Sequence, residues 1–424
     1  MSRVYSYYDE GLKLVPETLE KSYRKNAVIL GFQMTVTTTI LLYTSGAFLQ
    51  SFLLSFGVSA AKVGFVTSAY SLTQIISMVF CAFVSDKIKN IKRVFSFCAL
   101  PQIFFYIAMA LLCIVKKPDA DIVFLVTIIT LFILGIFLGV MNILVYKLPY
   151  LVMNMNNYGR FLSITGIVVG VFGVIVSAAG KFFIKNFDYY TVMLISFLIC
   201  AALVVAEYIF CSKLKTVNNP ENPKKERISF LEVFKHKSFL ILAIPNLFRG
   251  ISIGISGMIP VFAMKDFNAN ADMTASLSVI LNVASILSSV ALMFILSKFK
   301  GNTLCFWSSL LFCVPLFAMA FTKSWEWYLV LYFVFYFWLN VFGSAVPIYV
   351  AQIVPYEMMG GYTSLRMGLT TGGTALGSMI SGALVSTVSA SGMLIAAAVF
   401  QLVSGAVYGL YPYIQGRMEE IKIQ

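Results

Sequence analysis

Residues 122–146 read IVFLVTIITLFILGIFLGVMNILVY, an apolar run without a single charged side chain. An α-helix needs about 20 apolar residues to cross about 30 Å of hydrocarbon. Similar runs lie on both sides of this stretch, and we expect twelve membrane spans in total. They fall within 26–61, 63–85, 94–115, 122–146, 161–180, 189–206, 238–264, 273–297, 301–322, 327–356 and, divided near Val388, two within 367–416. The sequence therefore predicts an all-α integral membrane protein.

The composition of the 424-residue chain supports this fold class. Apolar residues make up 59% and charged residues 12%, against about 45–50% and about 25% in soluble domains. So few charges cannot cover a water-facing surface of this size. The positive residues behind the formal charge of +13 sit in short clusters between the apolar runs. They therefore indicate how the spans are oriented, and we expect no nucleic-acid partner. The expected partners are the lipid bilayer and a small solute, and we expect a monomer.

Lys and Arg residues orient the predicted spans. Most of the 31 lie in the N-terminal segment, in the loops that follow even-numbered spans (Arg366 included), and after the last span. The positive-inside rule then places both termini in the cytoplasm, in a cytoplasmic (inner) membrane. We expect a cytoplasmic segment at 1–25, six-helix bundles at 26–212 and 238–416, a cytoplasmic linker at 213–237, and a tail at 417–424.

Residues that could support enzymatic or metal chemistry are scarce. The seven cysteines lie inside apolar stretches and form no C-x-x-C pair, and His236 is the single histidine. No Gly-x-x-x-x-Gly-Lys stretch is present to hold a nucleotide. We therefore expect no metal, no cofactor and no enzymatic activity, with a membrane-embedded transferase as the less favoured alternative.

Weakly similar segments in the two halves of the sequence, separated by a fixed offset, indicate an internal repeat. Gly159-x6-Gly166-x3-Gly170 precedes and enters the fifth span, and Gly361-x6-Gly368-x3-Gly372 has the same spacing at the eleventh. Likewise the loop Asp86-Lys87-Ile88-Lys89-Asn90 is echoed by Ser297-Lys298-Phe299-Lys300-Gly301. These echoes predict two parallel, pseudo-symmetric six-helix halves.

The chain resembles the major facilitator superfamily over essentially residues 25–416. The family's loop signature is G-x-x-x-D-[RK]-x-G-[RK]-[RK]. In the stretch from Ala82 to Arg93, Asp86 and Lys87 match it, Ala82 replaces the first Gly, and the second Gly is missing. The resemblance implies secondary transport by alternating access, with a central cavity lined mainly by helices 1, 4, 7 and 10. It also implies a gating role for Asp86, Lys87 and, in the second half, Lys298; the alternative for Asp86 is a solvated loop acid.

The fifth span resembles the drug-antiporter signature G-x-x-x-G-P-x-x-G, but Val171 stands where the Pro belongs. The Arg of the family's helix-four proton-transfer signature is missing too. These departures make a proton-coupled drug exporter the alternative function. The resemblance also implies that helices 2, 5, 8 and 11 form the contact between the two halves, and the small residues on these helices would let them pack closely.

Polar side chains within spans usually face a bundle interior or a water-filled cavity, because they are costly in lipid. Amides and hydroxylated aromatics supply neutral donors, acceptors and stacking faces for a sugar-like or nucleoside-like solute. The expected substrate-binding residues are Gln33, Asn142, Tyr146, Asn246, Arg249, Asn282, Asn340 and Gln352.

Arg249 lies near the predicted centre of the seventh span, and three interpretations of it stay open. It binds an anionic group of the substrate, it holds carbonyls where Pro245, Gly250, Gly254, Gly257 and Pro260 interrupt the helix, or it pairs with a carboxylate at a span end. No Asp or Glu lies in mid-span, and Glu207 is interpreted as interfacial. A facilitator or an exchanger of an organic anion or sugar-like solute is therefore favoured over a proton symporter.

Overall fold

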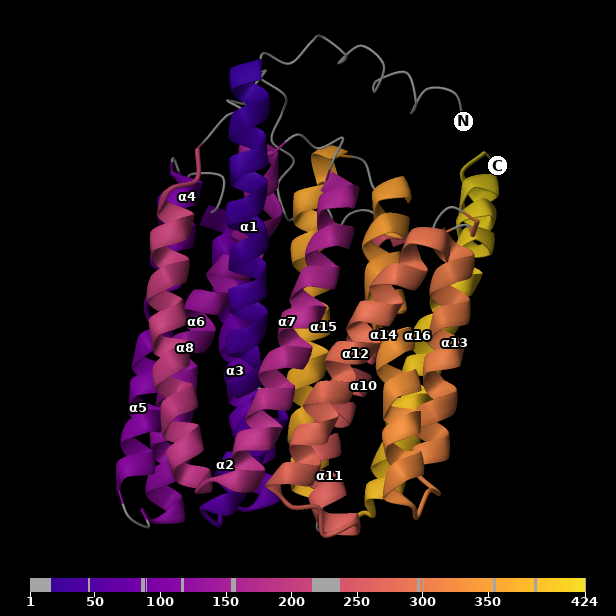
Figure 1. Ribbon diagram of the computed structural model, residues 1–424. Helices are drawn as coiled ribbons and strands as arrows, with labels where there is room; N and C mark the ends of the chain where they lie inside the picture. The colour runs from indigo at the N-terminus through magenta and orange to yellow at the C-terminus, as the bar shows by residue number, and fades with distance from the viewer. Residues whose placement is uncertain are drawn as a thin grey trace.

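The computed structural model describes residues 17–44, 46–84, 88, 90–115, 118–153, 158–215, 237–295, 298–299, 301–353, 356–384 and 387–423. Within these ranges the regular structure is helical, and Figure 1 shows the long helices running side by side along one direction. Helices are the form expected here, because a backbone in lipid must satisfy its hydrogen bonds within its own segment.

The first half of the chain forms one six-helix bundle, drawn from indigo to magenta in Figure 1. Its elements are α1 (Glu17–Thr44), α2 (Ala47–Ser55), α3 (Ala60–Val84), α4 (Ile91–Phe97), α5 (Gln102–Ile114), α6 (Ala120–Val152), α7 (Tyr158–Asn186) and α8 (Tyr189–Ser212). The first span consists of α1 and α2, and the third consists of α4 and α5.

The second half forms the other bundle, drawn from salmon to yellow. Its elements are α10 (Lys237–Ser256), α11 (Ile259–Asp266), α12 (Ala271–Ile295), α13 (Gly301–Met319), α14 (Trp325–Ile353), α15 (Tyr356–Leu384) and α16 (Ala390–Ile423). The start of α1 and the end of α16 lie at the same end of the molecule (Figure 1), as an even number of spans requires.

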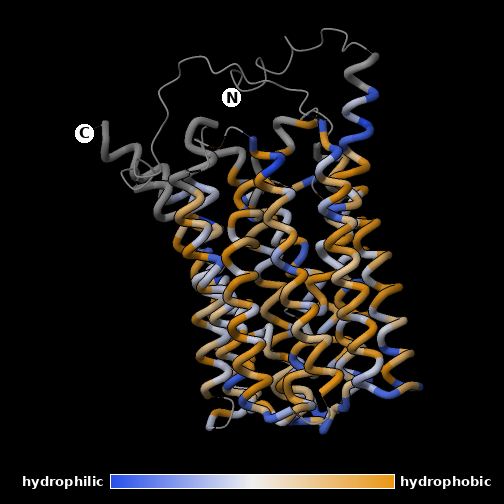
Figure 2. Tube along the Cα trace, turned by 90° about the vertical axis from the view of Figure 1, so that its left-hand side faces the viewer, coloured by the Kyte–Doolittle hydropathy of each residue, from blue (hydrophilic) through white to orange (hydrophobic). Residues whose placement is uncertain are grey.

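Eleven stretches among the described residues are long and apolar enough to cross a membrane. The expected eleventh span, α15, is as long as α7 but rich in Gly, Thr and Ser, and it falls outside that set. Figure 2 shows apolar residues along the bundle and hydrophilic ones gathered at its two ends. The predicted multi-pass, all-α fold is confirmed.

Two spans are broken at corresponding places in the two bundles. The first is interrupted between Thr44 and Ala47, and the seventh at Gly257 and Met258, with Pro260 in the first turn of α11. The expectation of interruptions at Pro245, Gly250 and Gly254 is wrong, since α10 is continuous through all three. Pro245 lies inside the helix, and the glycines serve a packing role instead.

Glycine brings α10 and α15 into backbone contact. A Cβ at Gly250 would lie 2.9 Å from the Cα of Gly373, and one at Gly254 would lie 3.0 Å from the Cα of Gly377. Each helix thus presents a Gly-x-x-x-Gly pair to the other, the pattern that lets membrane helices pack most closely.

The two bundles meet along α3 with α15 and along α7 with α12. At the first contact, a Cβ on Gly64 would lie 2.6 Å from the Cα of Gly382, and Ser68 Oγ donates to the Ala375 carbonyl at 2.9 Å. At the second, the small residues of α7 face Asn282 and Ile286 of α12. The predicted role of helices 2, 5, 8 and 11 at the contact between halves is confirmed.

Candidate substrate site

A cavity of about 300 Å³ lies within the second bundle among α10, α12 and α14. A volume of this size is at the lower end for small-molecule sites. It is lined by Arg249, Ile253, Ser285, Ser288, Ser289, Leu292, Leu339, Asn340, Gly343 and Ser344. One cation, one amide and several hydroxyls therefore converge on a single space.

Arg249 has a defined orientation at the cavity wall. Its guanidinium carbon lies 4.9 Å from the centroid of the Phe342 ring on α14. The next residue, Gly343, leaves room for the side chain, since a Cβ there would lie 3.3 Å from Nη2. A cation over an aromatic face is held by the ring's quadrupole, so Phe342 of α14 holds the guanidinium at the cavity wall.

The neutral polar groups of the cavity come from α12 and α14. Ser288 and Ser289 both donate to the carbonyl of Ser285, within α12, so each hydroxyl oxygen still has acceptor capacity. Asn340 Nδ2 is buried without a hydrogen-bond partner among the described residues. Buried polar atoms are normally satisfied by protein, water or ligand, so Asn340 is a natural contact for a solute.

Three of the expected binding residues lie elsewhere. Asn282 is 2% exposed and donates to Ser177 Oγ of α7 at 3.1 Å. Asn246 is fully buried and donates to the Ala243 carbonyl of its own helix. Gln33 is buried in the first bundle against Glu207. The NH2 group of each amide already donates to protein and none of the three lines this cavity, so their expected role in solute binding stays a prediction.

The remaining predicted residues are only partly described. Asn142 is half-buried, and its Nδ2 lies 3.5 Å from Gln74 Oε1 of α3. Lys298 lies in the turn after α12, where the backbone is described. Asp86, Lys87 and the side chains of Tyr146 and Gln352 lie outside the described residues, so their expected roles stay predictions.

Two buried charged residues differ from what the sequence predicts. Arg366, expected in a cytoplasmic loop, lies within α15 and is 5% exposed. Glu207, interpreted as interfacial, is fully buried and accepts hydrogen bonds from Gln33 and Thr37 of α1. Both corrections have one cause: the ends of an apolar run do not mark the ends of the helix.

The bundles also close on one another around α2 and α11, at the lower end in Figure 1. Gln50 Nε2 donates to the carbonyl of Gly257 at 2.8 Å, and the hydroxyls of Ser51 and Thr274 are 2.8 Å apart. The Gly257 carbonyl stands at the break between α10 and α11. Gln50 was not among the expected site residues, because nothing in the sequence pairs it with a carbonyl 207 positions away.

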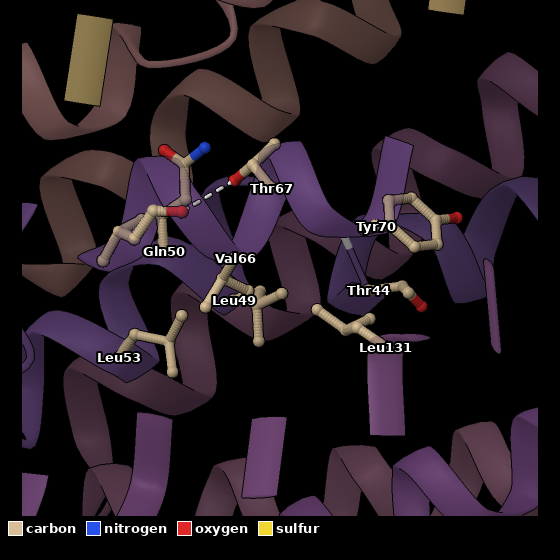
Figure 3. A pocket seen from close by; sticks show the side chains of 9 residues that line it. Thr44, Leu49, Gln50, Leu53, Val66, Thr67, Tyr70 and Leu131 are labelled. Atoms are coloured by element: carbon tan, nitrogen blue, oxygen red, sulfur yellow. Dashed lines mark hydrogen bonds between the residues drawn. The ribbon is translucent and has the colours of Figure 1, made fainter. Parts of the chain in front are cut away.

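A second cavity, of about 10 Å³, lies beside the break of the first span. Figure 3 shows Gln50 and Tyr70 on opposite sides of it, with Leu49 and Leu131 between. This volume holds about one water molecule. It is too small for a solute, so the larger cavity around Arg249 is the candidate site.

Two six-helix bundles that close on one another at one end, with a polar cavity in the second bundle, define a secondary transporter of the major facilitator type. The family model of the MFS_1 like family matches residues 44–396, and the chain belongs to that family.

Solved structures with this fold include a nucleoside transporter, NupG. A single-residue mutant of NupG superposes with a TM-score of 0.65 at 17% identity, covering 90% of this chain and 99% of that one. The crystal structure of NupG without that mutation gives 0.63 at 18% identity, covering 90% and 98%. At this identity the likeness shows the fold alone. No curated protein matches the chain significantly.

Proposed function

We propose that this transporter carries a small organic anion, and that Arg249 binds the anionic group. The observation that carries the proposal is the position of Arg249, the one charged residue among the described residues that line the cavity. Arg keeps its proton in proteins, and its planar fork matches a carboxylate or phosphate in a bidentate manner. Phe342 holds the guanidinium at the cavity wall.

The remaining lining suits the rest of such a solute. Asn340 offers an amide, and Ser285, Ser288, Ser289 and Ser344 offer hydroxyls. Ile253, Leu292 and Leu339 add apolar walls. A compact, polar molecule with one anionic end and several hydroxyl or carbonyl groups fits this set best.

The second candidate substrate is a nucleoside. The two NupG structures are described as nucleoside transporters, and most polar groups of this cavity are neutral. A nucleoside would use Asn340 and the serines, and would leave Arg249 to contact a base or ribose oxygen.

We further propose that transport crosses a cytoplasmic membrane with both termini in the cytoplasm, through a single copy of the chain. The closed end around α2 and α11 then faces outward. The gating role of Asp86, Lys87 and Lys298 would lie at the opposite end, and Asp86→Asn should slow transport without loss of solute binding.

The test is uptake by proteoliposomes of labelled succinate, gluconate, glucose and uridine, with wild type and Arg249→Gln. We expect wild type to take up a labelled acid and unlabelled acids to inhibit that uptake. Arg249→Gln should abolish it. Lys213→Gln is the matched control, because Lys213 also lies over an aromatic ring, that of Phe210, but is exposed at the end of α8. Uridine uptake that survives Arg249→Gln would favour the nucleoside instead.

A further inference from the structure

A buried carboxyl group lies in the first bundle, away from the cavity around Arg249. Glu207 of α8 is 0% exposed. Its Oε1 accepts two hydrogen bonds from α1, one from Gln33 Nε2 at 3.0 Å and one from Thr37 Oγ1 at 2.8 Å. Gln33 Nε2 also donates to Thr37 Oγ1 at 2.8 Å, so the three side chains form one connected cluster.

The cluster has two buried oxygens left over. Glu207 Oε2 and Gln33 Oε1 have no hydrogen-bond partner among the described residues. An ionised carboxylate and an amide oxygen are both acceptors, so they cannot satisfy each other. A proton on Oε2 changes this, because the carboxylic acid then donates through one oxygen while it accepts through the other. A protonated Glu207 can therefore keep its bonds through Oε1 while Oε2 gains a donor.

Among the described residues, none places a compensating positive charge against Glu207. The ionisable groups that interact with Glu207 are Tyr106 of α5 and Cys211 of its own helix. From α4, Lys92 directs its ammonium to the Leu214 carbonyl, and α1 presents the uncharged Gln33 and Thr37. No Lys or Arg in the described part of the chain forms an ion pair with Glu207, on α7 or elsewhere. A buried, unpaired carboxylate is strongly disfavoured, whereas the neutral acid is tolerated.

We propose that Glu207 is a proton-binding site and that the proton it holds crosses the membrane together with the solute. The proton is taken from water on one side, forms the Oε2–H bond, and returns to water on the other side when Glu207 ionises. Thr37, which bonds Glu207, is half-buried, whereas Gln33 is buried. This inference rests on the proposed transport function and adds its coupling ion.

The first bundle also links this site to the closed end. The helix α1 carries Gln33 and Thr37, and α2 continues the same span with Gln50 and Ser51, which bond to the second bundle. Loss of the proton would leave an ionised carboxylate whose Oε2 has no donor among the described residues. A movement of α1, which carries Gln33 and Thr37, would let water or another donor reach it. The same movement would act on the contacts of α2.

The first experiment needs no solute. Infrared spectra of the purified protein are recorded across a pH titration, following the carbonyl stretch of protonated carboxyl groups. At neutral pH exposed carboxyls are ionised, so we expect a band in wild type that disappears in Glu207→Gln. Glu326→Gln, at an exposed carboxyl in the first turn of α14, is the matched control and should keep the band. A wild type without the band, or a band that survives Glu207→Gln, overturns the proposal.

The second experiment separates coupling from transport. Proteoliposomes are tested for exchange of labelled against unlabelled succinate or uridine without a gradient, and for accumulation driven by an acid exterior. Glu207→Gln mimics the protonated side chain, so it should keep exchange and lose gradient-driven accumulation. Accumulation that persists in Glu207→Gln overturns the coupling. If wild type exchanges neither probe, the proposed substrate classes are wrong, and the infrared result still decides whether Glu207 holds a proton.

Discussion

The guanidinium of Arg249 lies over the face of Phe342, 4.9 Å from the ring centroid to the guanidinium carbon. The two residues come from different spans, α10 and α14, that border the same cavity. A cation over an aromatic ring in a partly desolvated site contributes about 1–2 kcal/mol. The ring of Phe342 on α14 therefore helps to position the positive charge that Arg249 carries on α10.

The first prediction is that Arg249→Lys weakens binding of an organic anion. A lysine ammonium is a point charge that neither stacks on Phe342 as a plane nor offers a bidentate fork. A loss of about 1.4 kcal/mol corresponds to a roughly tenfold higher KM. The measurement is succinate or gluconate exchange in proteoliposomes. An unchanged KM for the transported anion would show that the guanidinium does not contact it.

The second prediction concerns the approach of α3 to α15. In Gly382→Ala the new Cβ would lie 2.7 Å from the Cα of Gly64, and backbone there has little room to yield. Overpacking of this kind costs about 1–3 kcal/mol, so the closed end should open more often.

Spin labels on two exposed positions at the closed end, Ser59 and Asn268, report that opening as a longer distance between the bundles. Gly368→Ala is the control on the same helix, because a Cβ there meets nothing within 4 Å. Equal distance distributions in Gly382→Ala and Gly368→Ala would show that the Gly64–Gly382 contact does not help to close this end.

The third prediction is that Gln50→Ala also opens this end. The substitution removes the bond to the Gly257 carbonyl at the helix break, and the loss of one such hydrogen bond costs about 0.5–1.5 kcal/mol. The same pair of spin labels measures the shift. Gln102→Ala serves as control, since Gln102 is equally buried but lies on α5 within the first bundle. Opening of the same size in both variants would show that the Gln50–Gly257 hydrogen bond does not specifically hold this end closed.

The fourth prediction is the orientation. In a cysteine-free background, single cysteines at positions 90, 224 and 420 should react only from the cytoplasm. Cysteines at 119, 268 and 324 should react from outside. A cysteine at 224 that reacts with an impermeant reagent on intact cells would contradict the division into two six-helix bundles joined on the inside.

The fold followed from the sequence because hydrocarbon imposes a length and a polarity on each span. Arg366 marks where this reasoning failed. Its charge suggests the end of a loop, but α15 begins at Tyr356 and carries Arg366 inside the bundle. The breaks of the first and seventh spans were also only partly foreseen, since glycines that break a helix and glycines that pack one helix on another look alike in sequence.

The site was harder to predict, because sequence gives the depth of a residue along a span but not the neighbour it faces. Arg249 and Asn340 line a cavity within the second bundle, whereas the expected cavity was a central one lined mainly by helices 1, 4, 7 and 10. Asn282 has a similar character and depth, yet it points across the bundle contact to Ser177. The serines of α12 were expected only at the contact between halves, but Ser285, Ser288 and Ser289 also border the cavity.

The modest hydropathy of α15 has a consequence for how the protein is made. A helix rich in Gly, Thr and Ser gains little free energy from lipid when it leaves the translocon alone. Its favourable surroundings are α3 and α10, against which it packs. Both precede it in the chain, so they are already in the bilayer when α15 is synthesised. We therefore expect α15 to depend on earlier helices for its insertion, and chains lacking α10 to leave it stranded outside the membrane.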